Sequence, residues 1–129
     1  MDKLTNIEIG TFLKLFNRGG YVLDFTTNDF DVFTMESIGI ALCNEYHMSK
    51  GKSLAAYVNS ASTREIEKLL NDLLSYYEEN YEQEYTENLT DDEYSYCQYN
   101  AEYARLYKKC RAYMNRVLNN TTPLAVNAT

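Results

Sequence analysis

The side chains that most often carry out chemistry are few in this sequence, and their spacing matches no known catalytic motif. Gly51-Lys52-Ser53 is similar to the end of a phosphate-binding loop, but that loop needs a glycine five residues earlier, where this chain has Tyr46. His47 is the only histidine, and no Gly-x-Ser-x-Gly motif provides a serine for it to activate. We therefore expect no catalytic residue, and we expect Lys50 and Lys52 to be exposed at the start of a helix.

Metal and cofactor sites are not indicated either. The cysteines are odd in number and irregularly spaced, without a Cys-x-x-Cys pair: Cys43, Cys97 and Cys110. This pattern is neither a disulfide framework nor a zinc site, and it favours reduced thiols in the cytoplasm. The carboxylates of Asp24, Asp29 and Asp31 lack the glutamate that closes a calcium loop, so a turn that these side chains cap themselves is favoured over an ion site.

Acidic residues are concentrated in one segment of a chain whose net charge is −7. Residues 75–100 contain no Lys or Arg, and their carboxylates are Glu78, Glu79, Glu82, Glu84, Glu87, Asp91, Asp92 and Glu93. Such a run is usually a solvated helix face, and the alternative is a patch that receives a basic partner. The candidate acidic patch comprises Glu78, Glu79, Glu82, Asp91 and Asp92. Nucleic acid is not expected as a partner, because a large basic face is missing.

Tyrosine is the second unusual feature: ten of the thirteen tyrosines lie between Tyr76 and Tyr113. All five phenylalanines lie between Phe12 and Phe33, so we expect two structural halves that share one core. One stripe on the last expected helix follows a three-four spacing: Tyr96, Tyr99, Tyr103, Leu106, Cys110, Tyr113 and Val117. A second stripe runs beside it: Cys97, Ala104, Tyr107, Met114 and Leu118.

These two stripes are wider than one neighbouring helix needs, and tyrosine suits interfaces because its ring is apolar and its hydroxyl is polar. Packing within the chain, a seam with a second copy or domain, and an external partner all stay open. The candidate interface residues are Tyr96, Tyr99, Tyr103, Tyr107 and Met114, and they predict a homodimer.

The elements that position these residues are mainly helices. A Thr5-x-x-Glu8 capping box opens a helix that Gly19-Gly20 ends. Alternating apolar residues predict a short strand at 21–26, followed by a turn at 27–29. Thr34 resembles an N-cap, with Phe33 and Ile38 as a hydrophobic staple, and predicts a helix to about residue 46.

Three further helices are expected. Ser49 can cap one that runs to about Val58, and Ser62-x-x-Glu65 opens one whose apolar stripe continues to Tyr85. The capping box at 90–93 opens the last helix, which ends near residue 118. The predicted fold is mainly α, with about five helices, a long antiparallel hairpin of the last two, and one short β-strand or hairpin near residues 21–33. Residues 1–120 form a single helical domain and 121–129 a tail or linker.

No membrane partner is expected. The start of the chain lacks the basic and then apolar run of a signal peptide, and no stretch approaches the eighteen or so apolar residues of a membrane helix. We expect a cytoplasmic protein.

Several segments together resemble a known family: Phe-Asn-Arg-Gly-Gly-Tyr-Val-Leu-Asp-Phe (16–25), Phe-Thr-Met-Glu-Ser-Ile-Gly-Ile (33–40), Ser-Lys-Gly-Lys-Ser-Leu (49–54), Leu-Leu-Asn-Asp-Leu-Leu-Ser-Tyr-Tyr-Glu (69–78) and Leu-Tyr-Lys-Lys-Cys (106–110). They are similar to the N-terminal domain of bacterial abortive-infection proteins, in which a helical HEPN-type domain follows. The resemblance implies a part in antiphage defence, with the effector activity in that second domain. The Arg-x-x-x-x-His motif typical of HEPN ribonucleases is absent, because Leu42 stands five residues before His47.

The expected function is thus a non-catalytic protein-interaction or sensor module of an antiphage defence protein, without a cofactor. Its partner is an effector domain or a phage or host protein. The alternative is an acidic, phage-encoded inhibitor that mimics nucleic acid to block a host defence system. A third possibility is an enzyme whose site matches no known motif.

Overall fold

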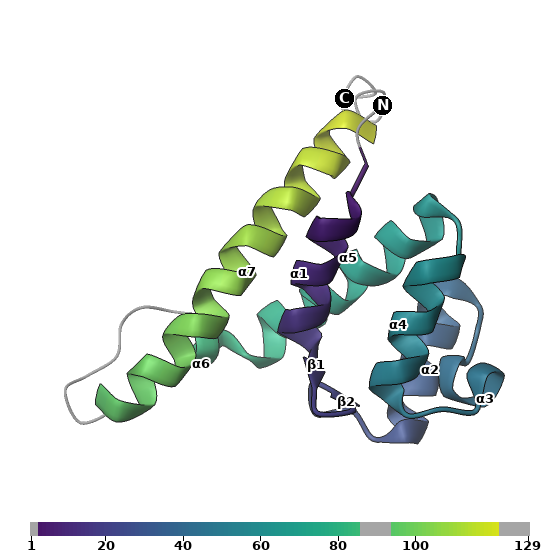
Figure 1. The fold of residues 1–129 in the computed structure, drawn as a ribbon, viewed down its shortest axis with the longest axis horizontal. Helices are drawn as coiled ribbons and strands as arrows, with labels where there is room; N and C mark the ends of the chain where they lie inside the picture. Colours follow the sequence, from purple (N-terminus) through teal and green to yellow (C-terminus); the bar gives the residue numbers. More distant parts are fainter. Residues whose placement is uncertain (1–2, 86–93, 122–129) are drawn as a thin grey trace.

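The structure is a computed structural model, and it describes residues 3–85 and 94–121, the side chains of 94–100, 120 and 121 excepted. Its elements in chain order are α1 (Asn6–Phe16), β1 (Asn17–Arg18), β2 (Tyr21–Val22), α2 (Thr27–Ile38), α3 (Leu42–Tyr46), α4 (Lys50–Ser60), α5 (Thr63–Asn80), α6 (Glu82–Tyr85) and α7 (Tyr94–Thr121). The expected mainly helical class is confirmed, as is a small antiparallel sheet (Figure 1).

The first helix begins as expected but ends at Phe16, so the expectation that Gly19-Gly20 ends it is wrong: Asn17 and Arg18 already form β1. Thr5 and Glu8 form the expected capping box of α1. Gly19 and Gly20 have positive φ angles of 65° and 93°, which allow the tight turn between β1 and β2. Gly20 also accepts a 2.9 Å hydrogen bond from the amide of Gly51 in α4. A Cβ atom at Gly51 would lie 3.3 Å from the Gly20 backbone, so this glycine allows the close approach. The strand is shorter than the expected 21–26.

The expected helix at 34–46 is wrong, because two helices occupy this region with different bounds. Thr26 caps α2 by accepting a hydrogen bond from the Asp29 amide at 3.0 Å, so the expected turn at 27–29 is the first turn of a helix. Gly39, with a φ angle of 78°, ends α2. Thr34 therefore lies in the middle of α2, buried, and not at its start.

The short helix α3 begins at Leu42 with no capping side chain of its own, since its N-cap is Ala41. Side chains of α2 supply the missing acceptors. The Asp31 carboxylate accepts hydrogen bonds from the amides of Cys43 at 2.7 Å and Asn44 at 3.2 Å, and the Thr34 hydroxyl accepts one from Leu42 at 3.2 Å. Asp31 is thus the N-terminal cap of a helix eleven positions further along the chain.

The strong apolar stripe expected on the fifth helix is confirmed. Ser62 caps α5, and the buried residues of the helix are Ile66, Leu69, Leu70, Leu73, Leu74 and Tyr77. The helix ends at Asn80 and not at Tyr85, because Tyr81 leaves the helical conformation and α6 forms a separate turn. The capping box expected at 90–93 lies outside the described residues.

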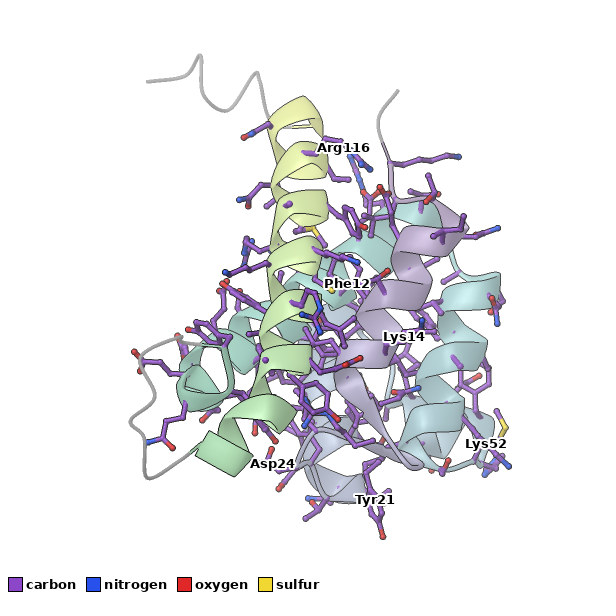
Figure 2. The ribbon with its side chains drawn as sticks, turned by 60° about the vertical axis from the view of Figure 1, so that its left-hand side comes forward. Phe12, Lys14, Tyr21, Asp24, Lys52 and Arg116 are labelled. Atoms are coloured by element: carbon purple, nitrogen blue, oxygen red, sulfur yellow. The ribbon has the colours of Figure 1, made fainter. Side chains whose placement is uncertain are left out.

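The expected long hairpin of the last two helices is not confirmed. The last helix, α7, lies antiparallel to α1 and contacts α6, while α5 crosses behind α1 (Figure 1). Arg116 near the end of α7 contacts the start of α1: its guanidinium donates to Glu8 at 2.6 and 2.8 Å and to the Lys3 carbonyl at 3.1 Å (Figure 2). The start of α1 and the last turns of α7 therefore lie next to each other.

One buried cluster of apolar side chains joins both halves of the chain. It includes Phe12 and Phe16 of α1, Phe30 of α2, and Tyr77 of α5, and it extends to Cys110, Met114 and Val117 of α7. The expectation of one shared core is confirmed for the described residues. No helix among those described is long and apolar enough to cross a membrane.

Candidate functional site

The candidate interface residues on α7 are mostly engaged within the chain. The ring of Tyr103 covers the guanidinium of Arg18, with 3.8 Å between the Cζ atom and the ring centroid. Tyr107 packs against Tyr85 at 4.3 Å between centroids, and its hydroxyl donates to Glu78 at 2.5 Å. Met114 is fully buried in the core, so its assignment to an exposed interface is wrong. The side chains of Tyr96 and Tyr99 lie outside those described.

The reason for the error at Met114 is the position of α7. The second apolar stripe was expected to meet a second copy of the chain unless the short helices of the N-terminal half covered it. In the structure α1 and α6 lie against α7 as well, and Ala104 and Met114 are buried beneath them.

The candidate acidic patch is likewise divided. Glu78 accepts hydrogen bonds from Arg111 Nε at 2.9 Å and from Tyr107, and Arg111 Nη2 lies 2.8 Å from the same carboxylate. Glu79 and Glu82 are exposed, while Asp91 and Asp92 lie outside the described residues. Glu78 is therefore neutralised within the chain.

Arg18 and Glu84 form the centre of a larger set of contacts that we call the tyrosine–arginine network: Arg18, Tyr77, Glu78, Tyr81, Glu84, Tyr85, Tyr103, Tyr107 and Arg111. The Arg18 guanidinium donates two hydrogen bonds to Glu84, at 3.0 and 3.1 Å, and the Tyr77 hydroxyl donates a third at 2.8 Å. Burial, with the Glu78 carboxylate, raises the pKa of Tyr107 to about 12. The Tyr107 phenol thus stays protonated at neutral pH, and the network joins β1, α5, α6 and α7.

A second acidic feature, unexpected from the sequence, lies between α2 and α5. We call it the acidic groove, an open hollow of about 330 Å³ lined by Phe33, Glu36, Ser37, Asp72, Ser75, Tyr76 and Glu79. Each helix contributes residues spaced three or four apart, which face the same side of a helix. Of the five residues of the candidate acidic patch, Glu79 lines this groove.

The base of the groove is aromatic and ordered by contacts behind it. Tyr76 stacks on Phe25 at 4.4 Å between centroids and meets Phe33 edge-on at 5.8 Å. Its hydroxyl donates to the Asp24 carboxylate at 2.8 Å. Burial, with this carboxylate, raises the pKa of Tyr76 to about 12. The ring is therefore held in place as a neutral phenol.

The three carboxylates of the groove differ in their partners. Asp72 accepts hydrogen bonds from the Ser37 hydroxyl at 2.6 Å and from the Lys68 ammonium at 2.8 Å. Glu36 and Glu79 are exposed and form no ion pair with any residue that the structure describes. Two free carboxylates beside aromatic rings attract a cation.

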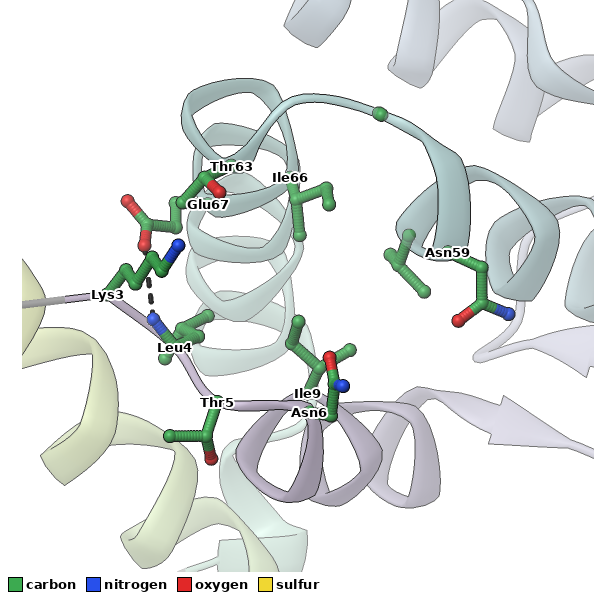
Figure 3. Close-up of a pocket in the computed structure, with 11 residues that line it drawn as sticks. Lys3, Leu4, Thr5, Asn6, Ile9, Asn59, Thr63, Ile66 and Glu67 are labelled. Atoms are coloured by element: carbon green, nitrogen blue, oxygen red, sulfur yellow. Dashed lines mark hydrogen bonds between the residues drawn. The ribbon is translucent and has the colours of Figure 1, made fainter.

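Another hollow, of about 430 Å³, lies between the start of α1 and the corner that joins α4 to α5 (Figure 3). Its apolar lining includes Ile9, Val58 and Ile66, and its rim carries Lys3 and Glu67. Glu67 accepts a 3.2 Å hydrogen bond from the amide of Leu4. Because the rim holds charges of both signs, this hollow indicates no ligand class.

The residues considered for catalysis are not brought together in the described part of the chain. His47 is exposed and has a φ angle of 56° at the C-cap of α3. Lys52 is exposed, but Lys50 is buried, against expectation, because its aliphatic chain packs inward and its ammonium lies 4.6 Å from the Tyr21 ring centroid. Cys43 and Cys110 are buried free thiols, and burial raises the pKa of Cys110 to about 12.

No group of three or more His, Cys, Asp and Glu side chains among the described residues could hold a metal ion. Comparisons of the chain with protein-family models, with curated proteins and with solved structures found no match. Function is therefore argued from the sequence and from the geometry of the acidic groove.

Proposed function

We propose that this chain is a non-catalytic protein-interaction module whose docking surface is the acidic groove. The observation that carries the proposal is the combination of free carboxylates and aromatic rings in the groove with an exposed apolar side chain beside it. Val32 of α2 lies one helical turn before Glu36, on the same side of the helix, and is 52% exposed. Apolar side chains with a charged rim are the composition of a protein-binding surface.

The biological setting that we propose is bacterial abortive-infection defence, with the module acting as a sensor or scaffold for an effector or for a phage or host protein. The support is the resemblance described above. Two of the segments that carry it, 33–40 and 69–78, also form the acidic groove: they contain every lining residue except Glu79. The docking surface and the family resemblance thus fall on the same parts of the chain.

The alternative, an inhibitor that mimics nucleic acid, has less support from the geometry. Such a mimic needs an array of free negative charges with a spacing similar to that of phosphates. Glu78 and Glu84 belong to the acidic segment, but Arg111 and Arg18 neutralise them.

The proposal is tested by capture of partners from phage-infected and uninfected bacteria, with identification by mass spectrometry and confirmation with the purified partner. The variant Glu36→Lys/Glu79→Lys reverses the charge of the groove, and Glu45→Lys/Glu102→Lys reverses two exposed acids elsewhere. We expect a partner that binds the unchanged chain and the control variant but not the groove variant. A partner set that is identical for all three proteins would contradict the proposal.

The non-catalytic part of the proposal needs a separate measurement. We expect the pure chain to leave single- and double-stranded RNA and DNA and the common nucleotides unchanged over hours. Turnover that follows the protein through purification, and that a single substitution abolishes, would contradict it and favour an enzyme.

A further inference from the structure

We propose that the acidic groove binds an arginine side chain of a basic segment of a partner protein, through the carboxylates of Glu36 and Glu79 and the rings of Phe33 and Tyr76. An apolar residue next to that arginine contacts Val32. The inference rests on the proposed function and names the chemistry of the partner.

The charge around the groove points to a cation. Glu36, Asp72 and Glu79 line the groove together with Tyr76, and Asp24 accepts the hydrogen bond of the Tyr76 hydroxyl. Among the described residues, the cation paired with one of these carboxylates is Lys68, which contacts Asp72. Asp72 also accepts a hydrogen bond from the Ser37 hydroxyl, so its negative charge is largely compensated. Glu36 and Glu79 remain as exposed carboxylates on opposite helices, α2 and α5, and a cation between them would relieve their repulsion.

The aromatic base favours arginine among the cations. A guanidinium is planar, stacks on aromatic rings, and donates paired hydrogen bonds to a carboxylate, whereas a lysine ammonium is a more strongly hydrated point charge. Tyr76 and Phe33 are only partly buried, and Phe25 behind them fixes the tilt of the Tyr76 ring. The base of the groove is therefore preorganised, so that little side-chain entropy is lost on binding.

The protein already binds a guanidinium with the same residue types elsewhere. Arg18 lies 3.8 Å from the centroid of the Tyr103 ring while it donates two hydrogen bonds to Glu84. The acidic groove presents a similar set, a tyrosine ring with glutamates beside it, but no arginine of the described residues is paired there.

The surroundings of the groove favour a peptide segment over a free cation. Val32, one helical turn before Glu36 on the same side of α2, adds exposed apolar area that a small hydrophilic cation does not use. An open groove of about 330 Å³ suits one inserted side chain with its backbone left outside. We therefore assign the groove to an arginine flanked by aliphatic residues.

The test uses the full chain, labelled with ¹⁵N, and three short peptides of the form Ser-Leu-X-Leu-Ser with blocked ends. X is arginine, lysine or citrulline, the last being close to arginine in shape but uncharged. We expect the arginine peptide to shift the amide signals of residues 32–37 and 72–79. The lysine peptide should bind more weakly, and the citrulline peptide at least about tenfold more weakly.

The matched variants are Glu36→Gln/Glu79→Gln in the groove and Glu82→Gln/Glu102→Gln outside it. We expect the groove variant to reduce the affinity for the arginine peptide at least about tenfold and the control variant to leave it within about twofold. All four positions are exposed, so both variants should keep well-dispersed spectra. An absence of shifts at millimolar arginine peptide, equal binding of the citrulline peptide, or equal loss in both variants would each overturn the inference.

Two other occupants give different results. Binding of spermidine at lower concentrations than the arginine peptide would assign the groove to a free polyamine and overturn the inference. Shifts of the same signals that grow with protein concentration alone would assign it to an arginine of a second copy, such as the exposed Arg64 or Arg105.

The inference and the proposed function can fail separately. If the peptides do not bind but the charge-reversal variant loses its partner in cells, the choice of arginine is wrong and the interaction module stands. If the arginine peptide binds but no cellular partner depends on the groove, the chemistry is right and the proposed function is wrong.

Discussion

Arg18 joins three segments that are distant in the chain. It lies in β1, pairs with Glu84 of α6, and is covered by Tyr103 of α7. Its side chain is 18% exposed and that of Glu84 14%. A charge pair this far from solvent stabilises a fold only when its hydrogen bonds are complete, and removal of one partner leaves an unpaired charge.

Replacement of Arg18 by alanine should therefore lower the free energy of unfolding by about 2–4 kcal/mol, since Glu84 loses its bidentate partner and Tyr103 its cation. The control is Arg105→Ala, because Arg105 and Glu102 are exposed and 3.8 Å apart, and this change should cost less than about 0.5 kcal/mol. Urea denaturation followed by circular dichroism measures both. Similar costs for the two variants would show that the network contributes no more than a surface ion pair.

The roles of these residues could be predicted only in part. A three-four spacing identifies Tyr103 and Tyr107 as one side of a helix, and this side does contact the rest of the chain. The spacing does not say that the Arg18 guanidinium lies against the Tyr103 ring, or that the Glu78 carboxylate accepts a hydrogen bond from Tyr107. Arg18 and Glu84 are 66 positions apart, and no local pattern links them. The two segments of the acidic groove were both recognised as helical, but Phe33 and Glu36 were placed near a helix start and not on its exposed middle.

Among the elements, α2 and α3 show why helix bounds were misplaced. Phe33 and Ile38 form an apparent staple around Thr34, so the sequence predicts a cap at Thr34 and a turn at 27–29. The chain instead uses Thr26, and it caps α3 with a side chain from α2. A cap supplied by another helix leaves no signal in the residues that precede the capped helix.

The cap predicts an effect of Asp31→Ala. The amides of Cys43 and Asn44 lose their acceptor, so unfolding should cost about 1–2 kcal/mol less. Hydrogen exchange should show the loss at those two amides before the rest of the chain opens. Val32→Ala is the control on the same helix, and because that side chain is exposed its effect should stay within about 0.5 kcal/mol. Unchanged exchange at Cys43 and Asn44 would argue against the cap.

The pairing of α1 with α7 predicts a dependence on pH. Hydrogen bonds from Arg116, with smaller contributions from Thr5, lower the pKa of Glu8 from 4.5 to about 2. A carboxyl whose pKa is lower in the folded state stabilises the fold above its unfolded pKa, and this contribution is lost as the pH falls toward the folded pKa. Glu8→Gln should therefore be less stable than the unchanged protein by about 1 kcal/mol at pH 7.

The difference between the two proteins should shrink as the pH falls from about 4.5 toward 2, where Glu8 becomes protonated. Melting temperatures measured in parallel at several pH values give this difference. The comparison variant is Glu67→Gln. Glu67 is a carboxylate at the same end of the molecule, and it accepts a hydrogen bond from a neutral donor, the Leu4 amide, at 3.2 Å. A difference that stays constant from pH 7 to pH 2 would assign the effect to packing and not to the charge of Glu8.

For the whole molecule, the mainly helical class and the shared core followed from the periodicity of apolar residues, but the arrangement of the helices did not. The stripes on α5 and α7 are both strong, and each requires a neighbour without specifying which one. The sequence predicts that these two long helices follow one another directly, and pairing them as a hairpin is then the simplest choice. The short α6 and the strand pair instead bring α7 to α1, and that choice depends on contacts such as that between Arg116 and Glu8.

Charge at the scale of the whole molecule predicts weak binding to nucleic acid. The net charge is −7, and Arg18, Arg111 and Arg116 are each paired with a carboxylate. We expect binding to duplex DNA or RNA with a dissociation constant weaker than roughly 100 µM near physiological salt, measured by fluorescence anisotropy. A sub-micromolar constant that rises steeply with salt would instead indicate a basic site formed by the remaining lysines.

The proximity of Lys3 to Arg116, at 3.1 Å between the carbonyl oxygen and the guanidinium, has a consequence for engineering. Because α1 begins beside the last turns of α7, a short flexible linker can join these two helices, and a new start can be opened at the corner between α4 and α5 (Figure 1). Such a circular permutant keeps α2 and α5 intact. The same geometry allows the domain to be grafted into a surface loop of a reporter protein, so that occupancy of the acidic groove can be read by fluorescence.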